Sequence, residues 1–309
     1  MIDAMMQCMK GQTIKAFRFL SNSIVVVASA SPSEPTAILE LFRVPVRNGT
    51  GRPTPMIKVA ALRLPAVDDD RHISHVNFYP PGVRDLVIRE RRLLYNASIH
   101  KIPFINPKFD TILFAKLNIG GGYPYANNSF IVYHSTLLRH VPPSGSLDNV
   151  QAPVPWELWG PAATRWCGGV SAMGRLTCGL RCLLNPGYSM EWELWDFNPY
   201  HVRRLGKDFA LENESVRLTV ETEPSCAKNE GIKNGIYSSL PFVKLVPKKW
   251  PQYRGVGLYE DRIIGELVSN YFDPPRGPLF LIFILTLVQQ GLGHGSHDGP
   301  YLAENLYFG

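Results

Sequence analysis

The sequence is a succession of short apolar segments separated by turn residues, and this pattern constrains the fold more than any other feature. IKAFRFL (14–20), IVVVA (24–28) and AILELFRV (37–44) are separated by turns of Ser, Asn and Pro. β-Branched and aromatic residues favour strands, and turns of this composition favour hairpin connections. Three such segments in succession predict an antiparallel meander.

The same cadence continues along the chain. It predicts further strands at 57–65, 75–80, 85–95, 110–118, 129–134, 164–168, 173–184, 191–198, 215–223, 235–247 and 255–267. The 26 Gly and 26 Pro residues make the chain rich in turns and argue against a helical bundle. We therefore predict an all-β, antiparallel fold, organised as a partial or small β-propeller of roughly 4–6 blade-like units.

Three regions differ in composition. Residues 1–12 predict a flexible start without the apolar run of a secretory signal. Residues 13–268 predict the propeller-like domain, with a possible subdivision at the Pro-rich stretch 141–155. Residues 269–309 form an atypical tail, whose end AENLYFG resembles a tag-cleavage site. The apolar run from Pro278 to Val288 is too short to cross a bilayer, so we predict a packed strand or helix and no membrane partner.

The charge and the cysteine content narrow the partners and the compartment. The net charge is +6, but the basic residues are scattered in small clusters, which predicts a solvated surface and no nucleic-acid site. The five cysteines are an odd number and contain no CxxC pair, so they do not form a disulfide framework. Reduced thiols indicate a cytoplasmic or nuclear protein.

The search for chemistry-bearing motifs points away from catalysis. The GGGY stretch at 120–123 lies between predicted strands, whereas a phosphate loop opens a helix. His72 and His75 are three residues apart and would face opposite sides of a strand, which prevents chelation. Glu191 and Glu193 would share a strand face, a feature that a glycosidase could use, but solvated carboxylates are far more common. We predict no catalytic residue, no metal and no cofactor.

The aromatic residues indicate binding rather than catalysis. All six tryptophans lie in the second half of the chain, where most are expected to pack in the core. Exposed Trp beside Arg is typical of protein interfaces, and Trp also stacks on sugars. Two segments, Pro155 to Trp166 and Pro199 to Leu205, combine length, Arg and aromatics, and we predict both to be loops. The predicted protein-interaction residues are Trp156, Trp159, Arg165, Arg203 and Arg204.

Four strings in this region resemble a known family. TRWCGG, DFNPYHVRRL, SLPFVKLV and YRGVGLYEDRIIG occur in the order and spacing of the C-terminal region of mushroom-type (basidiomycete) fungal F-box proteins. The resemblance covers residues 156–268, is weaker over 13–140 and does not include the tail. It implies a β-rich, propeller-like domain that recognises a client protein for a ubiquitin ligase.

The F-box itself is missing from the resemblance. An F-box is a compact helical module, and residues 1–12 are too few to form one. We therefore expect a non-catalytic protein-interaction domain that binds an unknown client and does not bind the ligase adaptor by itself. The alternative is a carbohydrate-binding or glycoside-acting β-propeller that uses the Trp and Glu residues.

Overall fold

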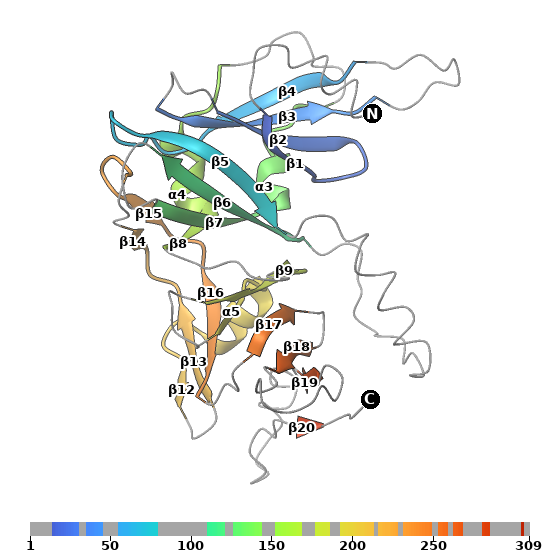
Figure 1. Cartoon of the computed structure of the whole chain (residues 1–309), viewed down its shortest axis with the longest axis vertical. Helices are drawn as coiled ribbons and strands as arrows, with labels where there is room; N and C mark the ends of the chain where they lie inside the picture. The colour runs from blue at the N-terminus through green and yellow to red at the C-terminus, as the bar shows by residue number, and fades with distance from the viewer. Residues whose placement is uncertain are drawn as a thin grey trace, which may run out of the picture.

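Antiparallel strands make up most of the structure, which is a computed structural model (Figure 1). It describes residues 14–30, 35–45, 55–79, 110–120, 126–143, 152–168, 177–185, 192–212, 216–227, 231–248, 253–258, 262–267, 280–284 and 304–305. The prediction of a mostly antiparallel β protein is confirmed. The strand predicted at 85–95 and the flexible start predicted at 1–12 lie outside the described residues.

The first sheet contains the predicted three-stranded meander, and the strand predicted at 57–65 joins it as a fourth strand. Its strands, in the order β1-β2-β3-β4, are β1 (Ile14–Phe19), β2 (Ile24–Ala30), β3 (Ala37–Arg43) and β4 (Ile57–Arg63). Every residue of β2 is buried, because Val26 and Ala28 pack in the main core while Val25 and Val27 join Phe42 on the opposite face. The sheet therefore carries apolar side chains on both faces.

The second sheet is also a four-stranded meander. Its strands, in the order β5-β6-β7-β8, are β5 (His72–Tyr79), β6 (Ile112–Gly120), β7 (Ala126–Tyr133) and β8 (Thr164–Gly168). Side chains alternate between its two faces. Leu113 and Ala115 pack against the first sheet, whereas Ile112 and Phe114 belong to a second core. This sheet is buried on both sides.

The third sheet is larger and is not a simple meander. Its order is β12-β13-β16-β11-β10-β9. The strands are β9 (Thr177–Cys178), β10 (Arg181–Leu184), β11 (Glu193–Asp196), β12 (Ala210–Glu212), β13 (Val216–Glu221) and β16 (Phe242–Pro247). The single strand predicted over 173–184 is interrupted by a turn, in which Gly179 adopts a φ of 58° that favours glycine.

Two smaller groups of strands are the remaining sheets of the described residues. β14 (Ser225–Ala227) and β15 (Ile236–Ser238) form a two-stranded ribbon. The fourth sheet contains β17 (Tyr253–Leu258), β18 (Arg262–Leu267), β19 (Phe280–Ile284) and β20 (Glu304–Asn305). β19 lies in the apolar run of the predicted tail and pairs with β18 across the boundary predicted at 268.

The first three sheets are stacked in layers. Figure 1 shows the blue first sheet above the cyan-to-green second sheet, with the yellow-to-orange third sheet below them. One hydrophobic cluster joins the first and second sheets, and another joins the second and third. Within the described residues the sheets are open and do not close into a ring.

In the described residues, three short helices lie in connections between strands: α3 (His134–Leu138), α4 (Trp156–Ala163) and α5 (Pro199–Leu205). The prediction of loops over 155–166 and 199–205 is therefore wrong, since most of each segment is helical. Asn198 before Pro199 is a helix-start signal, because Asn caps the first turn and Pro fits the first helical position. None of the helices in the described ranges is long and apolar enough to cross a membrane.

The end of the Pro-rich stretch 141–155, where a subdivision of the domain is predicted, is attached to the first sheet. The Val154 N–H donates to the Ala61 carbonyl (2.8 Å), and the Val154 carbonyl accepts from the Arg63 N–H (2.9 Å). These bonds form a parallel bridge beside β4 and fix the chain at the entrance to α4.

Candidate functional site

The two tryptophans of α4 lie inside the molecule. Trp156 is 7% exposed and Trp159 is 4% exposed. Their rings meet edge to face with centroids 5.0 Å apart, and Trp156 meets Trp166 of β8 in the same way at 5.7 Å. The Trp159 indole N–H donates to the Arg63 carbonyl (2.9 Å). These predicted interface residues therefore join α4 to the first two sheets and do not present a surface to a partner.

Arg165 is also buried, although it was predicted as an interface residue. Its Nη1 donates to the carbonyls of Glu223 (3.0 Å) and Ser238 (3.3 Å). The guanidinium carbon lies 4.8 Å from the centre of the Phe242 ring, at cation–π distance. Burial lowers the pKa of Arg165, and nearby Glu221 acts in the opposite direction. This side chain connects β8 to the β14–β15 ribbon and to β16, which is a structural role.

Arg203 and Arg204 are the two predicted residues that reach the surface. Both are exposed in the last turn of α5, and Tyr200 of the same helix is 56% exposed. The opposite side of α5 faces inwards, where Val202 is buried in the second core and Leu205 packs against it. The helix therefore has one packed side and one basic, aromatic side.

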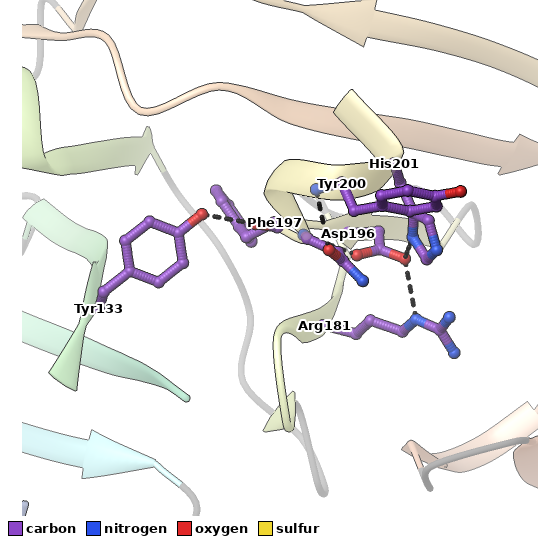
Figure 2. A network of polar contacts seen from close by, with 7 residues as sticks. Tyr133, Arg181, Asp196, Phe197, Tyr200 and His201 are labelled. Carbon is purple, nitrogen blue, oxygen red and sulfur yellow. Dashed lines mark hydrogen bonds and ion pairs between the residues drawn. The ribbon is translucent and has the colours of Figure 1, made fainter. Parts of the chain in front are cut away.

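A buried carboxylate at the end of β11 holds α5 in place (Figure 2). Asp196 Oδ2 accepts from Arg181 Nε (2.9 Å) and lies 3.0 Å from His201 Nδ1. The other oxygen, Oδ1, accepts from the Asn198 N–H (2.9 Å). Asn198 Oδ1 in turn accepts from the Tyr200 N–H (3.0 Å), which caps the first turn of the helix. The strand end, the turn and the helix are thus joined by one polar network.

The partners of Asp196 keep it ionised despite its burial. Burial alone would raise the pKa of this carboxyl group. The hydrogen bond to His201, the charge of Arg181 and the Asn198 N–H together outweigh burial and lower the pKa below its ordinary value of 3.8. The network is also tied to the second sheet, because the Tyr133 hydroxyl donates to the Phe197 carbonyl. Burial, with the charges of nearby carboxylates, raises the pKa of Tyr133 to about 12, so this donor keeps its proton.

Sequence reasoning singled out the arginines of this site but not the residues that position them. Asp196 and His201 stand in the DFNPYH string, where the Asn-Pro pair alone carries a structural signal. Asp two residues before Asn is also compatible with an Asx turn, which the Asn198 N–H completes here. Arg181 lies on the neighbouring strand β10, and nothing in the sequence links it to Asp196.

The described Trp and Glu side chains of β11, on which the carbohydrate alternative depends, form contacts within the protein. Trp195 is partly exposed, but its indole N–H donates to Glu193 (2.8 Å) and its ring stacks on Phe242 at 4.2 Å. Glu193 also forms an ion pair with Lys244 (2.8 Å) and lies on the face of β11 opposite Asp196. Glu191 lies outside the described residues. The described carboxylates of β11 thus do not form the pair that a glycosidase needs.

The prediction that His72 and His75 face opposite sides of a strand is wrong. A β-bulge lies between Ile73 and His75, so His72 pairs with Gly120 and His75 pairs with Asn118. Because paired residues share a face and these partners lie two positions apart, both histidines project from the same face of β5. Within the described residues, no third potential ligand joins them in a cluster that could hold a metal ion.

Comparison of the chain with protein-family models, curated proteins and solved structures finds no match. The resemblance to fungal F-box proteins therefore stays a prediction.

Proposed function

We propose that this chain is a non-catalytic protein-interaction domain that contacts its client through α5. The observation that carries the proposal is the outer face of α5, defined here as Tyr200, Arg203 and Arg204, which is exposed on a helix anchored by a buried ionic network. Tyr and Arg are enriched among the residues that dominate protein interfaces. A helix that is already held in place loses little conformational freedom on binding, which favours affinity.

The charge of this face favours an acidic client segment. Within the described part of the chain, neither Arg203 nor Arg204 forms an ion pair with another side chain. A guanidinium group binds carboxylates through two parallel hydrogen bonds, and an exposed Tyr adds apolar contact beside them. We infer that the client presents carboxylate side chains next to an apolar residue.

The stack of sheets supports a partial propeller as the framework of this site. The first two sheets are consecutive four-stranded meanders that pack face to face, as neighbouring propeller blades do. α5 lies in the connection between β11 and β12, and connections that a rigid framework positions are where binding residues usually lie. With the resemblance to F-box proteins, this favours the client-recognition part of a ubiquitin-ligase receptor.

A selection from random peptides tests the proposed contact. Peptides displayed on phage are selected on the purified chain and, in parallel, on the Arg203→Glu/Arg204→Glu variant. We expect the wild-type chain to enrich peptides rich in Asp and Glu, and the variant to lose them. Enrichment of the same acidic peptides by both proteins would contradict a role for the two arginines.

A matched control separates a specific site from general charge attraction. Arg139→Glu/Arg217→Glu changes the net charge equally at two other exposed arginines. We expect this variant to retain the wild-type peptides. If it loses them as well, the attraction is not specific to α5. Binding or turnover of a defined sugar on a glycan array would instead support the carbohydrate alternative.

A further inference from the structure

A small cavity lies in the main core, next to the second sheet. Its lining is mostly apolar and includes Val67, Leu117, Ile119 and Ile232, together with the polar side chains Asn128 and Trp166. Asn128 is completely buried, and Trp166 is 4% exposed. The two polar residues come from the neighbouring strands β7 and β8 and lie diagonally on one face of the sheet, because Phe130 pairs with Trp166.

Both polar side chains have hydrogen-bonding groups without a partner among the described protein atoms. Among the described residues, neither the amide nitrogen nor the amide oxygen of Asn128 has a partner, and neither does the indole nitrogen of Trp166. Buried polar groups in native proteins are almost always hydrogen-bonded, since leaving them unpaired is costly. Three such atoms at one apolar cavity therefore indicate a small polar occupant.

The size of the cavity limits what this occupant is. The space available to the centre of a water molecule is about 10 Å³, which is close to the lower limit for one buried water. A metabolite or a peptide side chain does not fit. Water can form hydrogen bonds with both side chains, because it accepts from the Trp166 indole N–H and can bond to the side-chain amide of Asn128. A cation would instead be repelled by the N–H groups of the indole and the amide.

We propose that this cavity is a binding site for one structural water molecule that bridges Trp166 Nε1 and the side-chain amide of Asn128. The water connects β7 to β8 through their side chains, at the position where Val67 and Ile232 close the cavity. It accounts for a buried asparagine beside the apolar side chains of Phe130 and Val132 on the same strand face. This site is independent of α5 and of the proposed function.

Water–protein nuclear Overhauser spectroscopy on the full chain tests the proposal directly. The Trp166 indole proton is assigned from the resonance that disappears in Trp166→Phe. We expect a cross-peak between this proton and water, with the sign of a long-lived bound water. The Trp159 indole proton is the internal control, because it is bonded to the Arg63 carbonyl (2.9 Å) and should give no such peak. Absence of the water peak at Trp166 would overturn the proposal, and this measurement needs no destabilised variant.

Asn128→Leu provides a second test. Leu has a similar volume but no hydrogen-bonding group, and cavities lined only by apolar atoms and one indole lose most of their attraction for water. We expect the folded variant to lose the water peak at Trp166. A peak that persists unchanged in this variant would exclude Asn128 as a ligand of the water. A crystal structure in which the cavity of the wild-type chain contains no density would overturn the site altogether.

Discussion

α4 and α5 are two short helices that replace two predicted loops, yet they have opposite roles. α4 packs Trp156 and Trp159 inwards and contacts β4, β8 and β15, whereas α5 carries two arginines on its exposed side. Trp156 and Trp159 belong to the main hydrophobic core, whereas the first turn of α5 is joined to β11 by a polar network. The tryptophans of α4 therefore serve packing, whereas Tyr200, Arg203 and Arg204 of the anchored helix lie at the surface.

The largest effect that would separate the two helices is the loss of an α4 tryptophan. We expect Trp156→Ala to lower the free energy of unfolding by about 3–5 kcal/mol, because it leaves a large cavity in the core. The ring packs so closely on Gly160 that a methyl group there would lie 2.3 Å from it. Urea unfolding followed by circular dichroism measures the change.

Leu158→Ala is the control on the same helix, since Leu158 is 77% exposed. We expect a change of about 0.5 kcal/mol or less in this variant. Equal losses in the two variants would mean that α4 is not packed as described. It would also remove the contrast with α5.

The next effect concerns the anchor of α5. We expect Asp196→Ala to lower the free energy of unfolding by about 3 kcal/mol, because it leaves Arg181 and His201 without their shared carboxylate. Asp208→Ala, at an exposed carboxylate, serves as control and should change little. A loss below about 1 kcal/mol in Asp196→Ala would show that packing of Val202, rather than the ionic network, holds the helix.

The same carboxylate predicts how this contribution depends on pH. The folded-state pKa of Asp196 is lowered, so its stabilising contribution is present above the ordinary value of 3.8 and is lost as the pH falls through the folded-state pKa. We expect the stability difference between the wild type and Asp196→Asn to be largest near neutral pH. It should shrink when the pH falls below 3.8. A difference that grows in acid would contradict the assignment.

A smaller effect tests the cap of α5. We expect Asn198→Ala to cost about 1 kcal/mol, because the Tyr200 N–H loses its side-chain acceptor. Asn198→Ser keeps an acceptor at this position and should recover most of the loss. Thermal unfolding of the three proteins in one buffer measures the differences. If Ser and Ala are equally destabilising, the capping bond does not contribute.

Local patterns predicted the strands of this fold well, and long-range contacts explain what they missed. The β1–β4 meander follows from residues close in sequence, so its hairpins are visible in the turn residues. The position of β16 between β13 and β11 depends on pairing between distant segments, which no local pattern records. Alternation of side chains identifies strands, but it does not show which sheet covers each face.

The candidate site also contains residues that a local pattern predicts and residues whose positions depend on distant contacts. Arg203 and Arg204 are predicted from the local sequence, because the segment that contains them combines Arg with aromatic residues. Arg165 was assigned to the surface because its acceptors, the carbonyls of Glu223 and Ser238, lie far away in the sequence. A buried arginine is recognisable only when its distant partners are known.

Substitutions on the outer face of α5 should change the stability least. We expect Arg203→Gln/Arg204→Gln to alter the free energy of unfolding by about 0.5 kcal/mol or less, because both side chains are exposed and only their interaction with the helix C-terminus is lost.

The affinity of this variant for a selected acidic peptide should fall at least about tenfold, since Arg contacts of this kind are often worth more than 1.4 kcal/mol. Isothermal titration calorimetry at two salt concentrations measures this. The wild-type affinity should weaken with salt, and the variant should be less sensitive, because exposed charge pairs are screened. If this variant loses as much stability as Asp196→Ala, the two arginines stabilise the fold, as the tryptophans of α4 do, and are not a binding surface.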